Sequence, residues 1–429
     1  MNYYLFAYIA LLLLAALLST RLMKLIKLPN VTGYIITGIL MGPFVFGMLF
    51  NNFSFDGIKD SPIYQCVDRI KWVSTVALGF IAFSIGTSFR AQTLKAVGKR
   101  VLIITVLEAS FASLFVIAIL IGAHFIFDEV TWPLVLTLGA IASATAPAAT
   151  LMVIKQYNAR GPLVNTLLPV VALDDAAALI LFAILFQVAN TLAIGGEFSI
   201  YKMLFKPIIE ILISLGVGAV IGFIISFMNR FFKSRNNRLI WCIFSVFAAL
   251  GVYYLFKYEA MGGFELSSLL ICMMAGVIYT NMCKDSNRTL DVVDRFTSPI
   301  YMMFFVISGA SLDLSIFANE KGLLVVGVAF VYVIFRVVGK YLGAYTGCSI
   351  SKCEPQVKKN LGLALIPQAG VAIGLATNAN TLFSYHETTA EAGALIIAIV
   401  LTSTLVYELV GPLFSKLALS KAGEIPDTI

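Results

Sequence analysis

Two adjacent carboxylates, Asp174 and Asp175, lie in the middle of an apolar run that reads TLLPVVALDDAAALILFAILF. A charged carboxylate near the centre of a bilayer costs roughly 2.5–3.5 kcal/mol on insertion scales, and two neighbouring carboxylates also repel each other. A membrane protein retains such a pair mainly where a cation or a proton must be carried across. The pair is therefore the first candidate for an ion-binding site.

Two basic side chains, Arg336 and Lys340, also fall inside an apolar run, at 323–346. They are four residues apart, so they lie on one face of a helix, with Lys340 one turn nearer its inner end. Lys340 could reach the interface by snorkelling, whereas Arg336 is near mid-depth and needs a buried anionic partner. The carboxylates at a suitable depth are Asp174, Asp175 and Glu108.

The composition is that of a membrane protein with many spans. Of 429 residues, 60% are hydrophobic and only 12% are charged, and the mean hydropathy is +0.93. No soluble domain accommodates so many apolar runs of about 20 residues. We therefore expect an all-α polytopic membrane protein with 13 transmembrane helices. The expected spans are 3–20, 31–49, 73–89, 101–127, 133–154, 164–189, 207–227, 239–256, 266–282, 297–317, 323–346, 361–382 and 392–417.

The loops between these spans predict an orientation. With the N-terminus outside and the C-terminus in the cytoplasm, the inner loops carry roughly three times as many basic residues as the outer loops. The net charge of +7 then reflects topology rather than binding of nucleic acid. We expect an integral protein of the cell (inner) membrane, in contact with membrane lipid.

Two of the spans are interrupted by proline and polar residues. The interruptions are Ser143, Thr145 and Pro147 in the span 133–154, and Pro367, Gln368 and Gly370 in the span 361–382. Proline removes a backbone hydrogen bond and clashes with the preceding turn of a helix. Irregular backbone survives at membrane depth only where it lines a cavity or is buried in protein. We expect two discontinuous helices at these places.

The interrupted spans occupy matching places in two groups of five spans, at 31–189 and 266–417. Each is the fourth span of its group, and the offset of seven spans makes the groups cross the membrane in opposite directions. Inverted repeats with broken helices at matching positions indicate a secondary transporter. We expect one transporter unit over residues 1–429, with no C-terminal cytosolic regulatory domain.

Together these motifs resemble the monovalent cation:proton antiporters, in the branch with two adjacent aspartates. The likeness rests on the aspartate pair, the SATAPAA segment one span earlier and the broken IPQAGVAIGLA span, and it covers nearly the whole chain. It implies crossed discontinuous helices near mid-membrane, a core domain that moves as an elevator against a dimerisation domain, and a homodimer. It also implies antiport of Na⁺ or Li⁺, with K⁺ as a further candidate, against protons in pH homeostasis.

The resemblance also implies roles for single residues. Asp175 resembles the carrier, which binds either the cation or the proton, so the two aspartates are the candidate ligands for Na⁺. Asp174 resembles the neighbour that pairs with a basic residue. Thr145 and Ser143 resemble residues that line the ion site.

The identity of the basic partner bears on the stoichiometry. In charge-moving members of the family it is a lysine, which can lose its proton during the cycle, whereas an arginine cannot usefully titrate. Arg336 as the basic partner therefore predicts electroneutral exchange of one cation for one proton. Its acidic partner is Asp174 or Glu108, and with Glu108 as the standing counter-ion Asp174 would be freer to titrate. Lys340, one turn away, keeps the charge-moving alternative open.

Other functions fit these residues less well. An intramembrane aspartyl protease needs carboxylates on two facing helices, whereas these are adjacent on one helix and point about 100° apart, so we expect no enzymatic activity. A channel would require a selectivity filter or a ring of charges, and the sequence has neither. A sodium-coupled symporter of an organic anion shares the inverted-repeat logic, and Arg336 could bind its anion. A structural ion pair with Arg336 would not need two carboxylates.

No cofactor is expected. The six cysteines, at 66, 242, 272, 283, 348 and 353, lack the spacing of metal ligands and are interpreted as apolar or loop thiols. Cys348 and Cys353 are five residues apart in a loop. The only partners expected besides lipid and a second copy of the chain are the transported cation and the proton.

Overall fold

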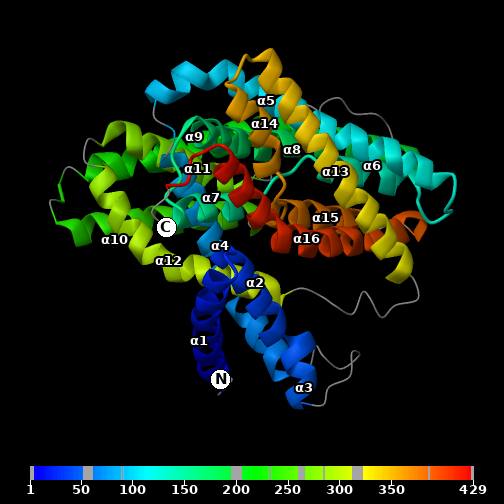
Figure 1. Ribbon diagram of the computed structural model, residues 1–429, viewed down its shortest axis with the longest axis horizontal. Coiled ribbons are helices and arrows are strands. Elements are labelled where there is room, and N and C mark those ends of the chain that lie inside the picture. The colour runs from blue at the N-terminus through cyan, green and yellow to red at the C-terminus, as the bar shows by residue number, and fades with distance from the viewer. Residues whose placement is uncertain are drawn as a thin grey trace. The chain divides into compact units, whose positions relative to one another are not determined.

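The computed structural model describes residues 4–51, 61–87, 89, 91–194, 205–229, 231–232, 234–258, 266–283, 286–311, 322–384 and 387–426. Within these residues the chain is all helical and contains no strand (Figure 1). Nine helical segments of the described chain are long and apolar enough to cross a membrane. Every predicted span overlaps a helix or an interrupted pair of helices. The expected all-α class is confirmed, and the number of 13 crossings remains a prediction.

The chain divides into two compact units, and each draws helices from both predicted repeats. Unit 1 comprises Met1–Arg21, Tyr34–Gly98 and Lys206–Ser311. The adjoining ends of its first two helices belong to unit 2. Its elements are α1 (Tyr4–Leu25), α2 (Asn30–Met41), the π-helix η1 (Pro43–Gly47), α3 (Met48–Asn51), α4 (Pro62–Thr87), α9 (Lys206–Met228), α10 (Arg235–Tyr258), α11 (Ser268–Met282) and α12 (Ser286–Ala310).

Glycines bring α4 and α11 of unit 1 into close contact. A Cβ at Gly86 would come within 1.9 Å of the Met273 carbonyl oxygen, and a Cβ at Gly276 within 2.3 Å of the Phe83 carbonyl oxygen. Small residues are the usual means by which membrane helices approach each other closely, because lipid supplies no hydrophobic drive for association. These two helices therefore pack backbone against backbone.

Unit 2 comprises Leu22–Gly33, Lys99–Phe205 and Leu312–Ile429. Buried side chains from most of its helices form one apolar core. In Figure 1, α15 and α16 lie side by side in orange and red. The elements are α5 (Ala91–His124), whose residues before Lys99 belong to unit 1, α6 (Trp132–Ile141), α7 (Pro147–Gln156), α8 (Pro162–Ile194), α13 (Gly322–Ile350), α14 (Pro355–Ala364), α15 (Gly370–Phe383) and α16 (Glu387–Lys421).

The predicted interruptions lie between α6 and α7 and between α14 and α15. Pro147 is the first residue of α7, where its missing N–H is no loss, and Ala146 before it is extended (φ −89°, ψ 112°). Gly370 is the first residue of α15. The two interruptions touch, because the Ala146 N–H donates a hydrogen bond to the Pro367 carbonyl over 2.8 Å. The expectation of crossed discontinuous helices is confirmed.

The C-terminal end of unit 2 folds back onto the start of α8, the helix that carries the aspartate pair. After α16, Gly423 has the left-handed φ of 71°, which turns the chain toward α8. The carboxylate of Glu424 accepts hydrogen bonds from the backbone N–H groups of Leu163 (2.5 Å) and Val164 (2.9 Å). A carboxylate here satisfies free N–H groups and complements the positive end of the helix dipole.

We expect Glu424→Ala to destabilise the protein by about 1–2 kcal/mol, because two N–H groups of α8 lose their cap. The measurement is the midpoint of thermal unfolding of the purified protein in detergent. Glu354→Ala is the matched control, since Glu354 also precedes a helix, α14, but makes no side-chain capping bond. Equal effects of the two substitutions would contradict the capping role.

Candidate ion-binding site

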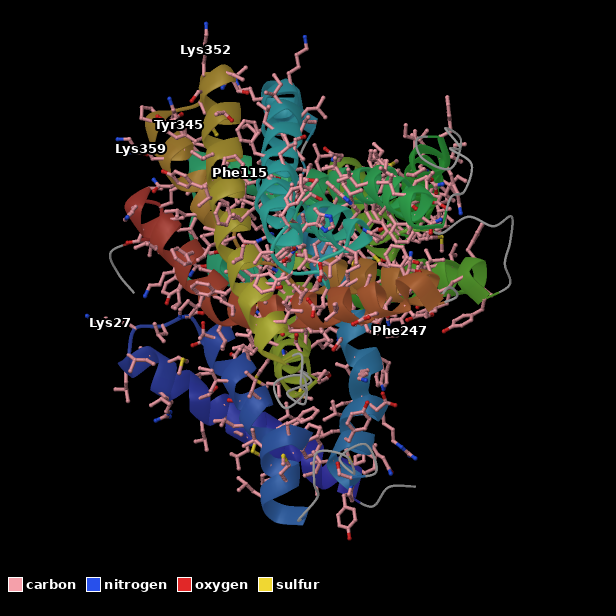
Figure 2. All side chains as sticks on the ribbon, turned by 90° about the vertical axis from the view of Figure 1, so that its right-hand side faces the viewer. Lys27, Phe115, Phe247, Tyr345, Lys352 and Lys359 are labelled. Carbon is pink, nitrogen blue, oxygen red and sulfur yellow. The ribbon has the colours of Figure 1, made fainter. Side chains whose placement is uncertain are left out.

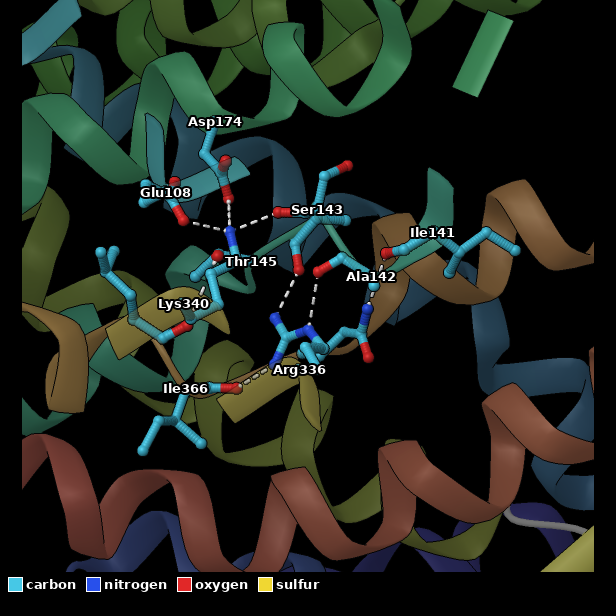
Figure 3. Close-up of polar contacts among 12 residues, drawn as sticks. Glu108, Ile141, Ala142, Ser143, Thr145, Asp174, Arg336, Lys340 and Ile366 are labelled. Carbon is cyan, nitrogen blue, oxygen red and sulfur yellow. Dashed lines mark hydrogen bonds and ion pairs between the residues drawn. The ribbon is translucent and has the colours of Figure 1, made fainter. Parts of the chain in front are cut away.

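Lys340 is the centre of a buried polar cluster in unit 2 (Figure 3). Its Nζ lies 2.5 Å from Oε2 of Glu108 on α5 and 3.0 Å from Oδ2 of Asp174 on α8. It also donates a hydrogen bond to the backbone carbonyl of Ser143, in the interruption between α6 and α7. The three charged side chains are fully buried. One ammonium group therefore serves two carboxylates at once.

Asp175, the next residue on α8, has no such partner. It is 6% exposed, whereas Asp174 is 0% exposed, and among the described residues its Oδ1 has no hydrogen-bond partner. Consecutive side chains of a helix point in different directions, so α8 offers the carboxylate of Asp174 to Lys340 and directs that of Asp175 elsewhere. We call Glu108, Asp174, Asp175 and Lys340 the carboxylate cluster. With every group ionised, its negative charges outnumber its single positive charge, and such an excess is neutralised by protons or by a bound cation.

Arg336 binds backbone carbonyls in both interruptions. Its guanidinium group donates hydrogen bonds to the carbonyl oxygens of Ala142 (2.9 Å), Ala144 (2.6 Å) and Ile366 (2.7 Å). The guanidinium carbon also lies 4.6 Å from the ring centroid of Tyr407 on α16, a cation–π distance. Arg336 is 0% exposed. The side chain thus clamps the two broken helices together.

The expected pairing of Arg336 with Asp174 or Glu108 is therefore wrong in this structure. Lys340 holds both carboxylates, and Arg336 holds carbonyls. The physical reason is that the C-terminal end of a helix carries partial negative charge on unsatisfied carbonyls, and α6 and α14 both end inside the protein. Arginine offers several donors in a planar fork, which suits several carbonyls better than the single point charge of lysine does.

Gln368 links the same two interruptions a second time. Its Nε2 donates to the Ile141 carbonyl at the end of α6 over 2.9 Å, and its Oε1 accepts a hydrogen bond from the hydroxyl of Tyr332 on α13 over 3.2 Å. Gln368 is 1% exposed, and a buried amide must be satisfied in this way. Gln368 therefore helps to fix the crossing of the broken helices.

The hydroxyls of Ser143 and Thr145 are engaged within the interruptions. Ser143 Oγ donates to the Ala140 carbonyl over 2.7 Å, and Thr145 Oγ1 donates to the Leu365 carbonyl over 3.4 Å. Ser143 thus presents its carbonyl, not its hydroxyl, to Lys340. A hydroxyl that donates one bond keeps lone pairs that can accept or coordinate. That these residues line an ion site stays a prediction.

A stripe of glycines on α13 brings Lys340 to Glu108. Gly339, Gly343 and Gly347 recur every four residues and face α5, and Figure 2 shows the two helices side by side. A Cβ at Gly343 would come within 2.5 Å of the Cα of Glu108. The helices therefore approach more closely than side chains would allow, and Glu108, whose Cα lies at this contact, forms the ion pair with Lys340.

Comparison with known proteins decides the family. Residues 9–416 match the family described as sodium/hydrogen exchanger, transmembrane. The chain belongs to the sodium/hydrogen exchanger family. Membership agrees with the predicted resemblance to monovalent cation:proton antiporters and makes the chain an integral membrane protein of a transporter family.

Relatives of this exchanger-family chain cover most of its length. The Na(+)/H(+) antiporter NhaS4 of Synechocystis sp. is 26% identical over 356 residues, which are 78% of this chain and 79% of the relative. Two structures of the sodium proton antiporter MjNhaP1 from Methanocaldococcus jannaschii have the same fold. One, at pH 8, gives a TM-score of 0.66 at 17% identity, over 98% of this chain and 99% of the other. A second, from an electron-microscopy map, gives a TM-score of 0.71 at 19% identity, over 99% of both chains.

Sequence reasoning missed part of this exchanger's site. It found every charged residue of the carboxylate cluster, and it did not find the roles of Tyr332 and Tyr407 or of the backbone carbonyls. A signal was present for Tyr332, which precedes Arg336 by four residues and so lies on the same face as Lys340. Backbone carbonyls have no sequence signal beyond the interruption itself.

We expect Arg336→Lys to destabilise the protein by about 1–3 kcal/mol, because one ammonium cannot reproduce the fork that reaches carbonyls in both interruptions. Thermal unfolding in detergent measures the loss. Arg100→Lys, at an exposed position of α5, is the matched control. If Arg336→Lys were as stable as the control, the clamp would be refuted.

Proposed function

We propose that this protein exchanges Na⁺ or Li⁺ for protons across the cell membrane, with K⁺ as a further candidate cation. The observation that carries the proposal is the unequal treatment of the two adjacent aspartates. Lys340 forms an ion pair with Asp174, whereas within the described residues Asp175 has no ion pair and keeps a small exposed fraction. Membership of the exchanger family and the name of NhaS4 as a Na⁺/H⁺ antiporter support sodium as the cation.

Competition for Asp175 supplies the exchange. A cation and a proton each neutralise the same buried carboxylate, so binding of one favours release of the other. Sodium prefers oxygen ligands without strict geometry, and carboxylates with the remaining lone pairs of Thr145 are candidates. The carbonyls of Ala142, Ala144 and Ile366 are already occupied by Arg336. No resident cofactor is needed, because the cation and the proton are themselves the cargo.

The transport step is proposed to be an elevator motion of unit 2. Every residue of the carboxylate cluster and both interruptions lie within unit 2, so one body could carry the complete site. Unit 1 would then supply the contacts of a homodimer. In this proposal the N-terminus lies outside, the C-terminus lies in the cytoplasm, and the asymmetry of basic loops supports that orientation.

Arg336 does not support the rival function of an organic-anion symporter. That function requires a base that is offered to a substrate. The Nε, NH1 and NH2 atoms of Arg336 each donate to a backbone carbonyl, and the side chain is 0% exposed. Arg336, which suggested a site for an organic anion, binds backbone carbonyls instead.

Asp175→Asn should abolish exchange, because the amide neither releases a proton nor neutralises a cation. Proteoliposomes that contain a pH-sensitive dye are challenged in turn with Li⁺, Na⁺ and K⁺. Asp128→Asn, an exposed substitution in the loop before α6, is the control and should keep the wild-type rate. Full activity of Asp175→Asn at several pH values would rule out Asp175 as the carrier.

The proposed stoichiometry is one proton per cation. The arginine from which electroneutral exchange was predicted binds carbonyls, so that reason is lost. The ion pair between Lys340 and Glu108 supplies another reason. When Asp174 turns toward a cation, Lys340 retains Glu108 and the Ser143 carbonyl as partners and can keep its proton. Asp175 then contributes the single exchanged proton.

Glu108→Gln should make exchange depend on the membrane potential, because Lys340 would lose its second carboxylate and release a further proton when the cation binds. The measurement finds the sodium gradient at which proton flux is zero, at several clamped potentials. In wild type and in the exposed control Glu129→Gln this gradient should not change with potential. The role of Glu108 would be contradicted if this gradient changed with potential in wild type, or if it did not change with potential in Glu108→Gln.

A further inference from the structure

The C-terminal end of α13 is closed by a turn that pairs two cysteines. The N–H of Cys353 donates to the Cys348 carbonyl over 2.9 Å, and the N–H of Lys352 donates to the Ser349 carbonyl over 3.2 Å. The backbone of Lys352 has the left-handed conformation, with φ 53°. These two bonds and the left-handed residue define a Schellman motif at the end of the helix. In this motif the side chain of the third-last helical residue, here Cys348, lies beside that of the second residue beyond the cap, here Cys353.

In most proteins that side-chain contact is between hydrophobic residues, and here it is between two thiols. The motif places the Cys348 and Cys353 side chains beside each other, and neither forms a disulfide in this structure. Cys348 is fully buried, whereas Cys353 is partly exposed. Cys353 is therefore accessible to a reagent from solution, whereas Cys348 is not.

Basic side chains lie near this thiol pair, and the acidic Glu354 directly follows Cys353. Figure 2 shows Lys352, Lys359 and Tyr345 at the same end of α13. The ammonium of Lys358 lies 4.4 Å from the ring centroid of Tyr345. Partly exposed thiols in electropositive surroundings are the ones that react with oxidants, whereas buried thiols in apolar surroundings are inert.

We propose that Cys353 and Cys348 form a redox pair that hydrogen peroxide closes to a disulfide. Cys353 attacks one oxygen of the peroxide, the O–O bond breaks, and Cys353 becomes a sulfenic acid while water leaves. Cys348 then attacks the sulfenic sulfur, the S–O bond breaks, and a second water leaves. Two thiols and one peroxide give one disulfide and two waters, and a dithiol reductant reverses the reaction.

The disulfide would fasten the turn that joins α13 to α14. Arg336 lies on α13, and the Ile366 carbonyl that it binds lies just beyond the end of α14. The motif already places the two side chains beside each other, which favours closure. The inference does not depend on the proposed ion exchange, since it concerns thiol chemistry at the end of one helix.

Peptide mapping of the purified full-length protein tests the pair. The protein in detergent is treated with limited hydrogen peroxide, denatured, alkylated with N-ethylmaleimide and digested with trypsin without reduction. Cleavage after Lys340, Lys352 and Lys358 separates the two cysteines. The expected product is one disulfide-linked species of peptides 341–352 and 353–358, which a reductant splits. The buried Cys66 and Cys272 should be alkylated in full and serve as internal controls.

Two variants separate the roles of the thiols. In Cys348→Ser the sulfenic acid of Cys353 cannot be resolved, so dimedone should label Cys353 several-fold more than in wild type. In Cys353→Ser the buried Cys348 should stay reduced and be alkylated after denaturation. Full alkylation of both thiols in peroxide-treated wild type, a disulfide from Cys353 to another cysteine, or equal dimedone labelling with and without Cys348 would overturn the proposal.

Discussion

A helix that ends inside a bilayer leaves carbonyls that water cannot reach, and the protein must satisfy them itself. In this chain two such helices, α6 and α14, end near each other, and Arg336 binds carbonyls beside both ends. Gln368 adds a second tie. The crossing of the broken helices, the position of the Ser143 carbonyl and hence the setting of Lys340 all depend on this clamp.

Arg336 and Lys340, the two buried cations of α13, therefore have different roles. Arg336 neutralises the partial charges of helix ends, which do not change during a transport cycle. Lys340 faces full charges on carboxylates, which can change by gain or loss of a proton or a cation. A spacing of one helical turn is enough for this division, because the two side chains point to the same face at different depths. The carboxylate cluster can thus exchange its ligands without disturbing the ends of the broken helices.

Much of this arrangement was readable in the sequence, and its limits have physical causes. Proline and polar residues in apolar runs located both interruptions, and rare buried charges located Glu108, Asp174, Asp175, Arg336 and Lys340. The prediction that Arg336 pairs with a carboxylate was wrong. Position along the helix shows only how far Arg336 and Lys340 lie from the membrane surface, and not which groups they face. Which base meets a carboxylate depends on the direction in which α13 faces α5, and on carbonyls that no side-chain pattern records. The glycines that decide this direction, Gly339, Gly343 and Gly347, are common in membrane helices and gave no distinct signal.

Those glycines have a consequence for the electrostatics of the cluster. The distance between the Lys340 ammonium and the Glu108 carboxylate is limited by the close approach of the two helix backbones at Gly343. Coulomb energy in a medium of low polarity changes steeply with separation. The strength of the ion pair therefore depends on the absence of a side chain at Gly343. A single methyl group at this uncharged, apolar position would push α13 and α5 apart and weaken the charge interaction one turn away.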